Sequence, residues 1–358
     1  MKNINESSFY SCHFYIGIDT HLKNWRVTTK LDGIELKTLS MNPSPVELLN
    51  YLRKKYPGGI YHVVYEAGFC GFWAARKFKE LGVDCIIVNP ADVPTSNKEK
   101  VNKNDPIDSR KLARELENKS LNGIYIPDIF HEELRSLMRL RYRIVQNQTR
   151  IKNRIKSLLY TRGIKIPDRF KGKSRWSAAF INWLEKEIKF DTTAGNYCFM
   201  DMISQLKQLR AHNKSVLKQL REEAKRKEIA PIIKALQSVP GIAFIIAMSL
   251  YTEIIDMKRF SYEDQTNTFV GLVPSTRSSD ENIYSNGISF RQNKFLRPLM
   301  IEAAWQAVKE DPARTAKYKE LTKRMKPQDA IIRIAKKLLR RVRHVWLKQE
   351  EYVYALVA

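Results

Sequence analysis

The sequence contains no uninterrupted apolar run of about 18 residues, the length that a membrane-spanning helix requires. Residues 1–6 lack the apolar segment of a signal peptide. The cysteines have no paired spacing and the six histidines are dispersed, which argues against a zinc site and a cysteine–histidine nucleophile pair. We therefore expect a cytoplasmic protein with reduced thiols and no membrane partner. The four thiols are those of Cys12, Cys70, Cys85 and Cys198.

Acidic residues are scarce relative to basic ones. The 358 residues include 63 Lys and Arg against 38 Asp and Glu, which gives a formal net charge of +25 and a pI of about 9.8. A cytosolic protein this basic most often has a polyanionic partner, and nucleic acid is the commonest. A generally basic soluble surface is the alternative. The length of the chain predicts two or three domains.

The first part of the chain has the pattern of a mixed α/β domain. Residues 13–20 alternate, so that Ile16 and Ile18 are expected on one side of a strand and Asp19 on the other. Two further strands, a helix, a strand, a helix and a strand follow, over residues 24–30, 34–39, 45–54, 60–65, 71–81 and 83–88. This order is that of the ribonuclease H-like architecture, a mixed sheet flanked by helices.

Four of the few acidic residues occupy positions where this architecture brings them together. Asp19 lies on the first strand and Glu66 ends the fourth, and these two strands are neighbours in this topology. Asp105 is expected at the N-cap of a helix and Asp108 in its first turn. The alternative for this pair is helix capping and a favourable dipole interaction. Converging carboxylates need a neutralising cation, and the arrangement suits two Mg²⁺ ions that clamp a phosphodiester.

The middle of the chain is helical and strongly cationic. Residues 131–161 and 200–225 carry apolar residues at steps of three and four, which predicts an antiparallel coiled-coil arm. The first of these helices is unusually rich in cations, which favours a phosphate-binding face, with a solvated coiled-coil face as the alternative. The connection interleaves cations with aromatic side chains, which suits single-stranded or structured RNA. The candidate nucleic-acid contacts here are Arg139, Arg143, Arg150, Arg154, Lys171, Lys173 and Arg175.

The last part of the chain reads as mainly helical. The turn of residues 239–242 resembles a helix-hairpin-helix, whose backbone N–H groups can contact phosphate. A serine-rich polar stretch follows and is expected to be a loop, containing Ser275, Ser278 and Ser279. Beyond it, Arg291, Lys294 and Arg297 are further candidate nucleic-acid contacts.

Several of these motifs occur in an order that resembles one family from end to end. The motifs are Gly17-Ile18-Asp19, Tyr65-Glu66-Ala67-Gly68, the run of residues 103–113, Val239-Pro240-Gly241-Ile242, Gly271-Leu272-Val273-Pro274 and the run of residues 287–297. Together they resemble the DEDD-type insertion-sequence transposases of the IS110 group, which also includes the Piv-like DNA invertases. The resemblance implies a RuvC-like domain that binds Mg²⁺ through Asp19, Glu66, Asp105 and Asp108.

The resemblance also implies a serine nucleophile from the loop after the Gly-Leu-x-Pro motif. The matching position is Ser279, although Asp280 follows where the family has glycine, and Ser278 and Ser275 lie in the same loop. The implied reaction cuts and rejoins DNA through a covalent 5′-phosphoserine intermediate. An element-encoded bridge RNA would pair with donor and target DNA.

The implied organisation has three parts, in a bacterial or archaeal protein associated with the nucleoid. They are a RuvC-like DEDD domain (1–125), a basic coiled-coil arm (126–230) and a helical C-terminal transposase domain (231–358). The family also implies a dimer or tetramer whose active site is composed from different subunits. Two alternatives stay open, namely a RuvC-like metal-dependent nuclease that uses water and a non-enzymatic basic nucleic-acid-binding protein.

Overall fold

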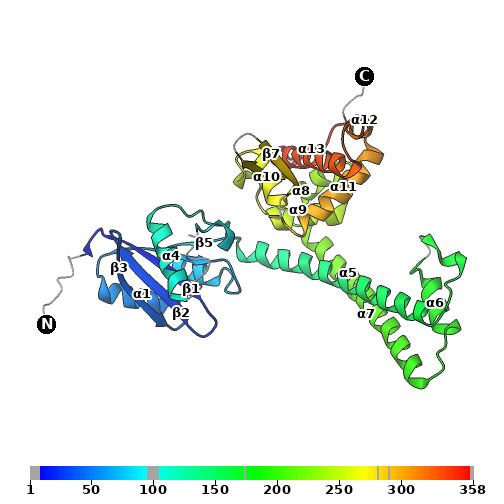
Figure 1. Ribbon diagram of the computed structural model, residues 1–358, viewed down its shortest axis with the longest axis horizontal. Helices are drawn as coiled ribbons and strands as arrows, with labels where there is room; N and C mark the ends of the chain where they lie inside the picture. Colours follow the sequence, from blue (N-terminus) through cyan, green and yellow to red (C-terminus); the bar gives the residue numbers. More distant parts are fainter. Residues whose placement is uncertain (1–8, 95–104, 173–174, 280–281, 289–290, 355–358) are drawn as a thin grey trace. The chain divides into compact units, whose positions relative to one another are not determined.

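The computed structural model describes residues 9–94, 105–172, 175–279, 282–288 and 291–354. The chain divides into two compact units, residues 1–126 and residues 127–358 (Figure 1). No helix among the described residues has the length and apolar character needed to span a membrane.

The first unit is built on a five-stranded mixed sheet with the strand order β3-β2-β1-β4-β5. Neighbouring strands are antiparallel in the β3-β2-β1 part and parallel in the β1-β4-β5 part. The predicted β-β-β-α-β-α-β order is confirmed, and it is consistent with a ribonuclease H-like fold. The elements are β1 (His13–Thr20), β2 (Trp25–Leu31), β3 (Ile34–Met41), α1 (Pro45–Lys55), β4 (Ile60–Glu66), α2 (Trp73–Glu80), β5 (Asp84–Val88), the 3₁₀ turn η2 (Pro90–Asp92) and α4 (Asp105–Glu117).

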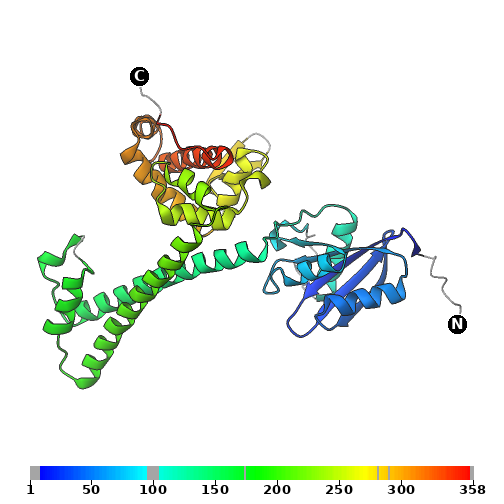
Figure 2. The same ribbon diagram turned by 180° about the vertical axis from the view of Figure 1, so that it is seen from behind.

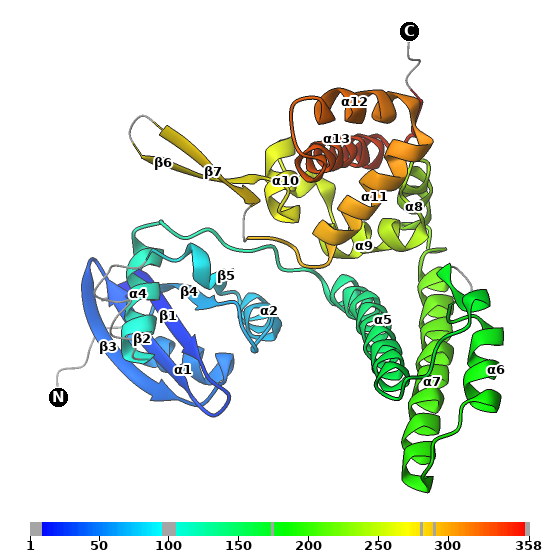
Figure 3. The ribbon, with the colours of Figure 1, turned by 45° about the vertical axis from the view of Figure 1, so that its right-hand side comes forward.

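Helices cover both faces of this sheet (Figure 3). On one face Ile16 and Ile18 of β1 pack with Leu52 of α1 and Phe78 of α2 in the larger apolar core of the unit. On the other face Leu112 of α4 packs in a smaller core with residues of β4 and β5. The alternation in β1 therefore predicts correctly which side is apolar, and it puts Asp19 on the side of α4.

Gly17 allows α4 to approach the sheet closely. A Cβ atom at this position would lie 2.2 Å from the carbonyl oxygen of Ser109 and 2.5 Å from the backbone nitrogen of Ala113. Both atoms belong to the backbone of α4, so relief of the contact requires movement of the whole helix. Only glycine fits here without separating the helix from β1.

We expect Gly17→Ala to destabilise the first unit by about 1–3 kcal/mol, because overpacking at a rigid contact costs that much. The measurement is the temperature of its unfolding transition in calorimetry of the full-length protein. The matched control is Gly68→Ala, where the added Cβ meets only a carbonyl oxygen 4.0 Å away. Equal transition temperatures for the two variants would show that α4 is not seated against Gly17.

In its described residues, the second unit consists of helices and a β-hairpin. Residues 178–187 form a helix that the sequence pattern did not indicate. The prediction of a loop for the serine-rich stretch is wrong, because residues 274–279 and 282–288 form two antiparallel strands. The elements are α5 (Ile129–Thr161), η3 (Asp168–Phe170), α6 (Ala178–Glu187), α7 (Thr193–Glu223), α8 (Ala230–Gln237), α9 (Phe244–Ile254), η5 (Met257–Arg259), α10 (Glu263–Val270), β6 (Pro274–Ser279), β7 (Asn282–Ile288), α11 (Leu296–Glu310), α12 (Pro312–Thr322) and α13 (Pro327–Lys348).

The two longest helices, α5 and α7, pack against each other in antiparallel directions (Figure 2). Ile155 in the last part of α5 shares an apolar core with Phe199 in the first part of α7. Leu134 near the start of α5 shares the other core with Leu220 near the end of α7. Helix α6 adds Phe180 to the first of these cores. Both predicted long helices are confirmed.

The turn between α8 and α9 packs against α11. Gly241 has a φ of +81°, and a Cβ atom there would lie 2.3 Å from the carbonyl oxygen of Ala303. The backbone N–H of Gly241 donates a hydrogen bond to the Glu310 carboxylate, over 3.0 Å. A phosphate at this turn, as the helix-hairpin-helix pattern predicts, would therefore have to displace a carboxylate.

Candidate active site

The site begins where the parallel strands β1 and β4 end side by side. Ile18 is paired with Tyr65, so Asp19 and Glu66 are the next residues on the two neighbouring strands. Parallel partners in register point to the same face of a sheet. The two carboxylates therefore share the face on which α4 packs. Sequence reasoning predicts this adjacency through the strand order.

Helix α4 is fastened to this face at both of its ends. The hydroxyls of Thr28 and Ser109 are hydrogen-bonded at 2.9 Å in a buried contact, next to Asp108 in the chain. At the other end Glu117 accepts hydrogen bonds from the Lys30 ammonium at 2.6 Å and from the backbone N–H of Gly33 at 2.7 Å. Burial opposes ionisation there, yet these two donors hold the pKa of the Glu117 carboxyl below its usual value. This fastening therefore weakens in acid, as the pH falls through that lowered pKa.

A buried lysine joins two of the predicted acids. The Lys111 side chain is only 9% exposed, and its Nζ lies 3.2 Å from Asp108 Oδ1 and 3.8 Å from Glu66 Oε1. The carboxylate of Asp19 contacts an imidazole, since its Oδ2 lies 3.2 Å from Nε2 of His21. Sequence reasoning missed Lys111, although its place three residues after Asp108 on a helix is a usable signal.

The four predicted acids are brought together only in part. Lys111 joins Glu66 to Asp108, and Asp19 lies at the adjacent strand end. Asp105 is the first residue of α4, one residue later than an N-cap would be, and its side chain lies outside the described part of the structure. In the parts of the chain that the structure describes, no three carboxylate, imidazole or thiol groups are close enough to hold a metal ion.

The chemistry of the donors nevertheless suits a divalent cation. Carboxylate oxygens are the ligands that Mg²⁺ prefers, and two of the carboxylates already converge on a cation, the Lys111 ammonium. The side chains of Asp19, Glu66 and Asp108 are 23%, 32% and 34% exposed, so an ion and a phosphate can reach them from solvent.

The predicted serine lies in the other unit. Ser279 is the last residue of β6, and its backbone pairs with Asn282 of β7. The side chains of residues 275–287 lie outside the described part of the structure, and so does the turn of residues 280–281. The acids and the serine therefore belong to two separately folded units of the chain.

Comparison with known proteins connects these two halves. The family sequence model for the DEDD transposases of IS110 elements matches residues 16–162. A second family sequence model, that of the transposase IS116/IS110/IS902 family, matches residues 233–319. The chain belongs to the IS110 family of transposases. Members of this family are enzymes that act on DNA.

Individual relatives are similar over most of the chain. The y4qE protein of Sinorhizobium fredii, named as a transposase, is 29% identical over 67% of this chain and 57% of its own length. The transposase for IS1111A of Coxiella burnetii is 26% identical over 81% of this chain and 79% of its own. The transposase for IS1533 of Leptospira borgpetersenii is 25% identical over 82% and 84%. This chain thus spans just over half the length of the first relative and about four fifths of the other two.

Arg139, a predicted nucleic-acid contact of this IS110-family chain, is bound to other residues of the protein. The Arg139 guanidinium donates to both carboxylate oxygens of Glu253, at 2.7 and 2.8 Å, and lies 4.5 Å from the centre of the Phe295 ring. Glu253 also accepts a hydrogen bond from Asn293 at 2.9 Å. These contacts join α5, α9 and the segment between β7 and α11, which favours a structural role for Arg139.

The other predicted contacts are distributed over the surface of the second unit. Arg143, Arg291 and Lys294 are exposed, whereas Arg297 is half-buried and desolvation lowers the pKa of its guanidinium. Lys171 forms an exposed ion pair with Asp168 at 2.7 Å. Arg175 is half-buried, and Lys173 lies outside the described residues. Arg150 and Arg154 line a groove between α5 and α7.

Proposed function

We propose that this chain is a transposase that cuts and rejoins DNA, with Ser279 as the nucleophile and with an element-encoded bridge RNA to select the sites. The observation that carries this proposal is the placement of Asp19 and Glu66 at adjacent strand ends, facing a helix whose Lys111 joins Glu66 to Asp108. Membership of the IS110 family supports the same assignment.

Asp19, Glu66 and Asp108 would hold Mg²⁺, with Asp105 as the fourth ligand. A bound ion would polarise the scissile phosphate and lower the pKa of a nearby hydroxyl. Without a bound ion, the Lys111 ammonium offsets part of the repulsion between the carboxylates and contacts both Glu66 and Asp108. The fixed position of α4 against Gly17 then keeps Asp108 beside the strand ends.

The proposed reaction exchanges one phosphodiester for another. The Ser279 Oγ attacks phosphorus, the Oγ–P bond forms and the P–O3′ bond breaks, and the serine proton leaves while the departing 3′ oxygen gains a proton. The 5′ phosphate is then esterified to the protein, so the bond energy is kept for rejoining. Attack by another 3′ hydroxyl reverses these bond changes and releases the serine.

The three parts of the chain would divide the remaining tasks. We assign metal binding to residues 1–125, assembly and nucleic-acid contacts to a coiled-coil arm over residues 126–230, and the serine with further DNA contacts to residues 231–358. Base pairing in the bridge RNA would read the sequence, while the protein recognises backbone and shape. A homodimer or homotetramer in the cytoplasm, at the nucleoid, would let one subunit supply the serine to the acids of another.

The test is a search for the covalent intermediate. Wild-type protein is incubated with Mg²⁺, the RNA from the element's flank and end-labelled donor DNA, and the products are separated on a denaturing gel. We expect a slow band that protease removes and that EDTA prevents. Cleaved DNA without this band would overturn the serine mechanism and leave a metal-dependent nuclease that uses water. Binding without cleavage would indicate a nucleic-acid-binding protein.

Lys111→Met tests whether the ammonium and a divalent ion compete for the same carboxylates. We expect Mn²⁺, a spectroscopic substitute for Mg²⁺, to bind at least about tenfold more tightly to the variant, because one buried positive charge is removed beside the ligands. The measurement is free Mn²⁺ by electron paramagnetic resonance, without DNA. The control Arg110→Met removes the same charge from the preceding residue, which is paired with Glu35. Weaker binding by Lys111→Met would show that the lysine organises the ligands instead.

A further inference from the structure

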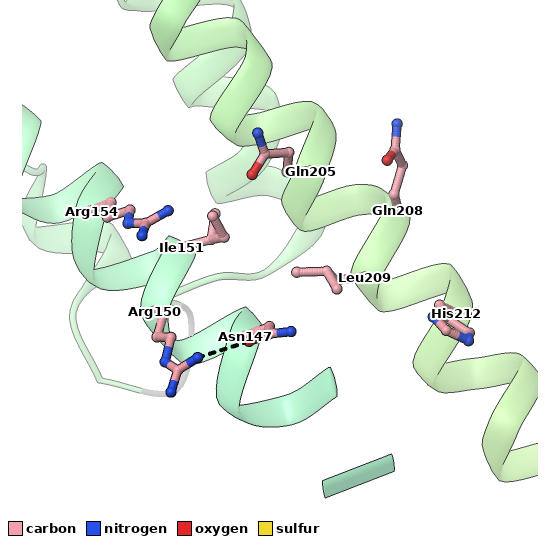
Figure 4. Close-up of a pocket in the computed structure, with 8 residues that line it drawn as sticks. All are labelled: Asn147, Arg150, Ile151, Arg154, Gln205, Gln208, Leu209 and His212. Carbon is pink, nitrogen blue, oxygen red and sulfur yellow. Dashed lines mark hydrogen bonds between the residues drawn. The ribbon is translucent and has the colours of Figure 1, made fainter. Parts of the chain in front are cut away.

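A polar groove runs between the two long helices of the second unit. It has a volume of about 510 Å³ and is lined from α5 and α7 (Figure 4). Its floor is the contact between Ile151 and Leu209, whose side chains point toward each other from the two helices. Gln148 of α5, which is buried, donates a hydrogen bond to the carbonyl oxygen of the lining residue Leu209 at 3.0 Å. This bond joins α5 to α7 at the groove.

The rim of the groove is cationic. Arg150 and Arg154 are one turn apart on α5, and both are exposed. Within the described residues neither forms an ion pair, and the polar contact of Arg150 is a 3.3 Å hydrogen bond to Oδ1 of Asn147 (Figure 4). No carboxylate lines the groove among the described residues, although Asp201, one turn along α7, accepts a hydrogen bond from Gln205. Two guanidinium groups without acidic partners favour a phosphate-bearing ligand.

The remaining lining side chains are of the kind that reads the edge of a base. Asn147, Gln205 and Gln208 each offer an amide donor and an amide carbonyl, and His212 adds a ring nitrogen. Amides and imidazoles over an apolar floor match a planar ring with polar edges, whereas a bare phosphate would use only the arginines. A base within a duplex is stacked and paired, so only an unpaired one can enter such a groove.

We propose that this α5–α7 groove binds an unpaired nucleotide of a single strand. Arg150 and Arg154 contact the phosphates, the base lies over Ile151 and Leu209, and its edge meets the amides of α7. The inference rests on the proposed function only in that nucleic acid is the partner. Single-stranded RNA and single-stranded DNA share this chemistry, and the experiment below separates them.

The test is binding of the full-length protein to a labelled 20-nucleotide RNA, the DNA of the same sequence, and the corresponding DNA duplex, followed by fluorescence anisotropy in EDTA. We expect Arg150→Gln with Arg154→Gln to weaken the preferred single strand at least about tenfold and to lower its salt slope by about 1.4, since two phosphate contacts are lost. Gln205→Leu with Gln208→Leu should weaken the same ligand with an unchanged salt slope. Whichever single strand, RNA or DNA, loses more affinity in these groove variants is identified as the ligand of the groove.

The matched control is Lys156→Gln with Arg162→Gln, which removes one charge from α5 and one from the residue that caps its C-terminus, both outside the groove lining. It should weaken the single strands and the duplex alike and by less. The proposal is overturned if the groove variants and this control lose affinity identically. It is also overturned if Arg150→Gln with Arg154→Gln binds as wild type does while its helical circular dichroism is unchanged. Because EDTA excludes cleavage, the result does not depend on whether the covalent intermediate forms. If the covalent intermediate forms but the groove variants bind nucleic acid as the control does, the proposed function stands and the groove proposal is rejected.

Discussion

Ser279→Ala is expected to abolish the covalent protein–DNA band. If the serine oxygen is the nucleophile, its removal lowers strand cleavage by at least about 10⁴-fold, the scale seen when serine enzymes lose their nucleophile. Water is a poor replacement, because it would have to occupy the position from which the side chain attacks. The measurement is the rate of adduct formation in a single turnover with Mg²⁺, RNA and donor DNA.

The neighbouring serines provide the controls for this variant. Ser278→Ala and Ser275→Ala change the same strand, and the backbone of Ser278 pairs with Ile283 in the same hairpin. We expect both to form the adduct at rates close to wild type. An adduct that disappears only in Ser278→Ala would move the nucleophile by one residue. Unchanged cleavage without an adduct in every protein would assign the attack to water.

The fold of the first unit could be predicted because its signals are local. The alternation at Phe14, Ile16 and Ile18 indicates a strand with one apolar side, and the structure buries all three. The order of strands and helices then restricts the topology, since parallel strands need a helical crossover between them. The adjacency of Asp19 and Glu66 follows when that order is taken as the ribonuclease H-like topology, in which the first and fourth strands are neighbours.

The details of the site could not be predicted because they depend on partners distant in sequence. Lys111 looks like an ordinary surface lysine of a helix until α4 is placed against Gly17, which buries its stem and directs its ammonium to Glu66. Arg139 likewise reads as a cation for phosphate until Glu253 appears opposite it. A residue's charge shows which partners it can take, and only the packing shows which one it has.

The hairpin of β6 and β7 escaped prediction for a related reason. Its first strand, Pro274–Ser279, is short and polar and lacks the alternation that marks a half-buried strand. The pairing of β6 with β7, which places Arg277 opposite Tyr284 and Ser278 opposite Ile283, supplies a ladder of backbone hydrogen bonds that no single-strand pattern reveals. Strand preference depends strongly on such context. The serine that the resemblance identifies therefore lies at the end of a strand and not in a loop.

Asp108→Asn and Glu66→Gln are each expected to lower strand cleavage by at least about 10³-fold, because the loss of a metal ligand removes several kcal/mol of charge stabilisation. Both changes keep the size of the side chain and remove one negative charge beside Lys111. The measurement is single-turnover cleavage with Mg²⁺. The control is Asp84→Asn, an exposed carboxylate at the start of β5 whose partner is His62.

Cleavage measured beside stability distinguishes this role from the alternative in which Asp108 only favours the start of α4. A carboxylate in the first turn of a helix contributes about 0.3–1 kcal/mol through the helix dipole. Under that alternative Asp108→Asn unfolds at a lower temperature and cleaves DNA as wild type does. For a metal ligand, Asp108→Asn should cleave poorly. Its unfolding temperature in EDTA falls under either role, because the substitution also removes the ion pair with the buried Lys111.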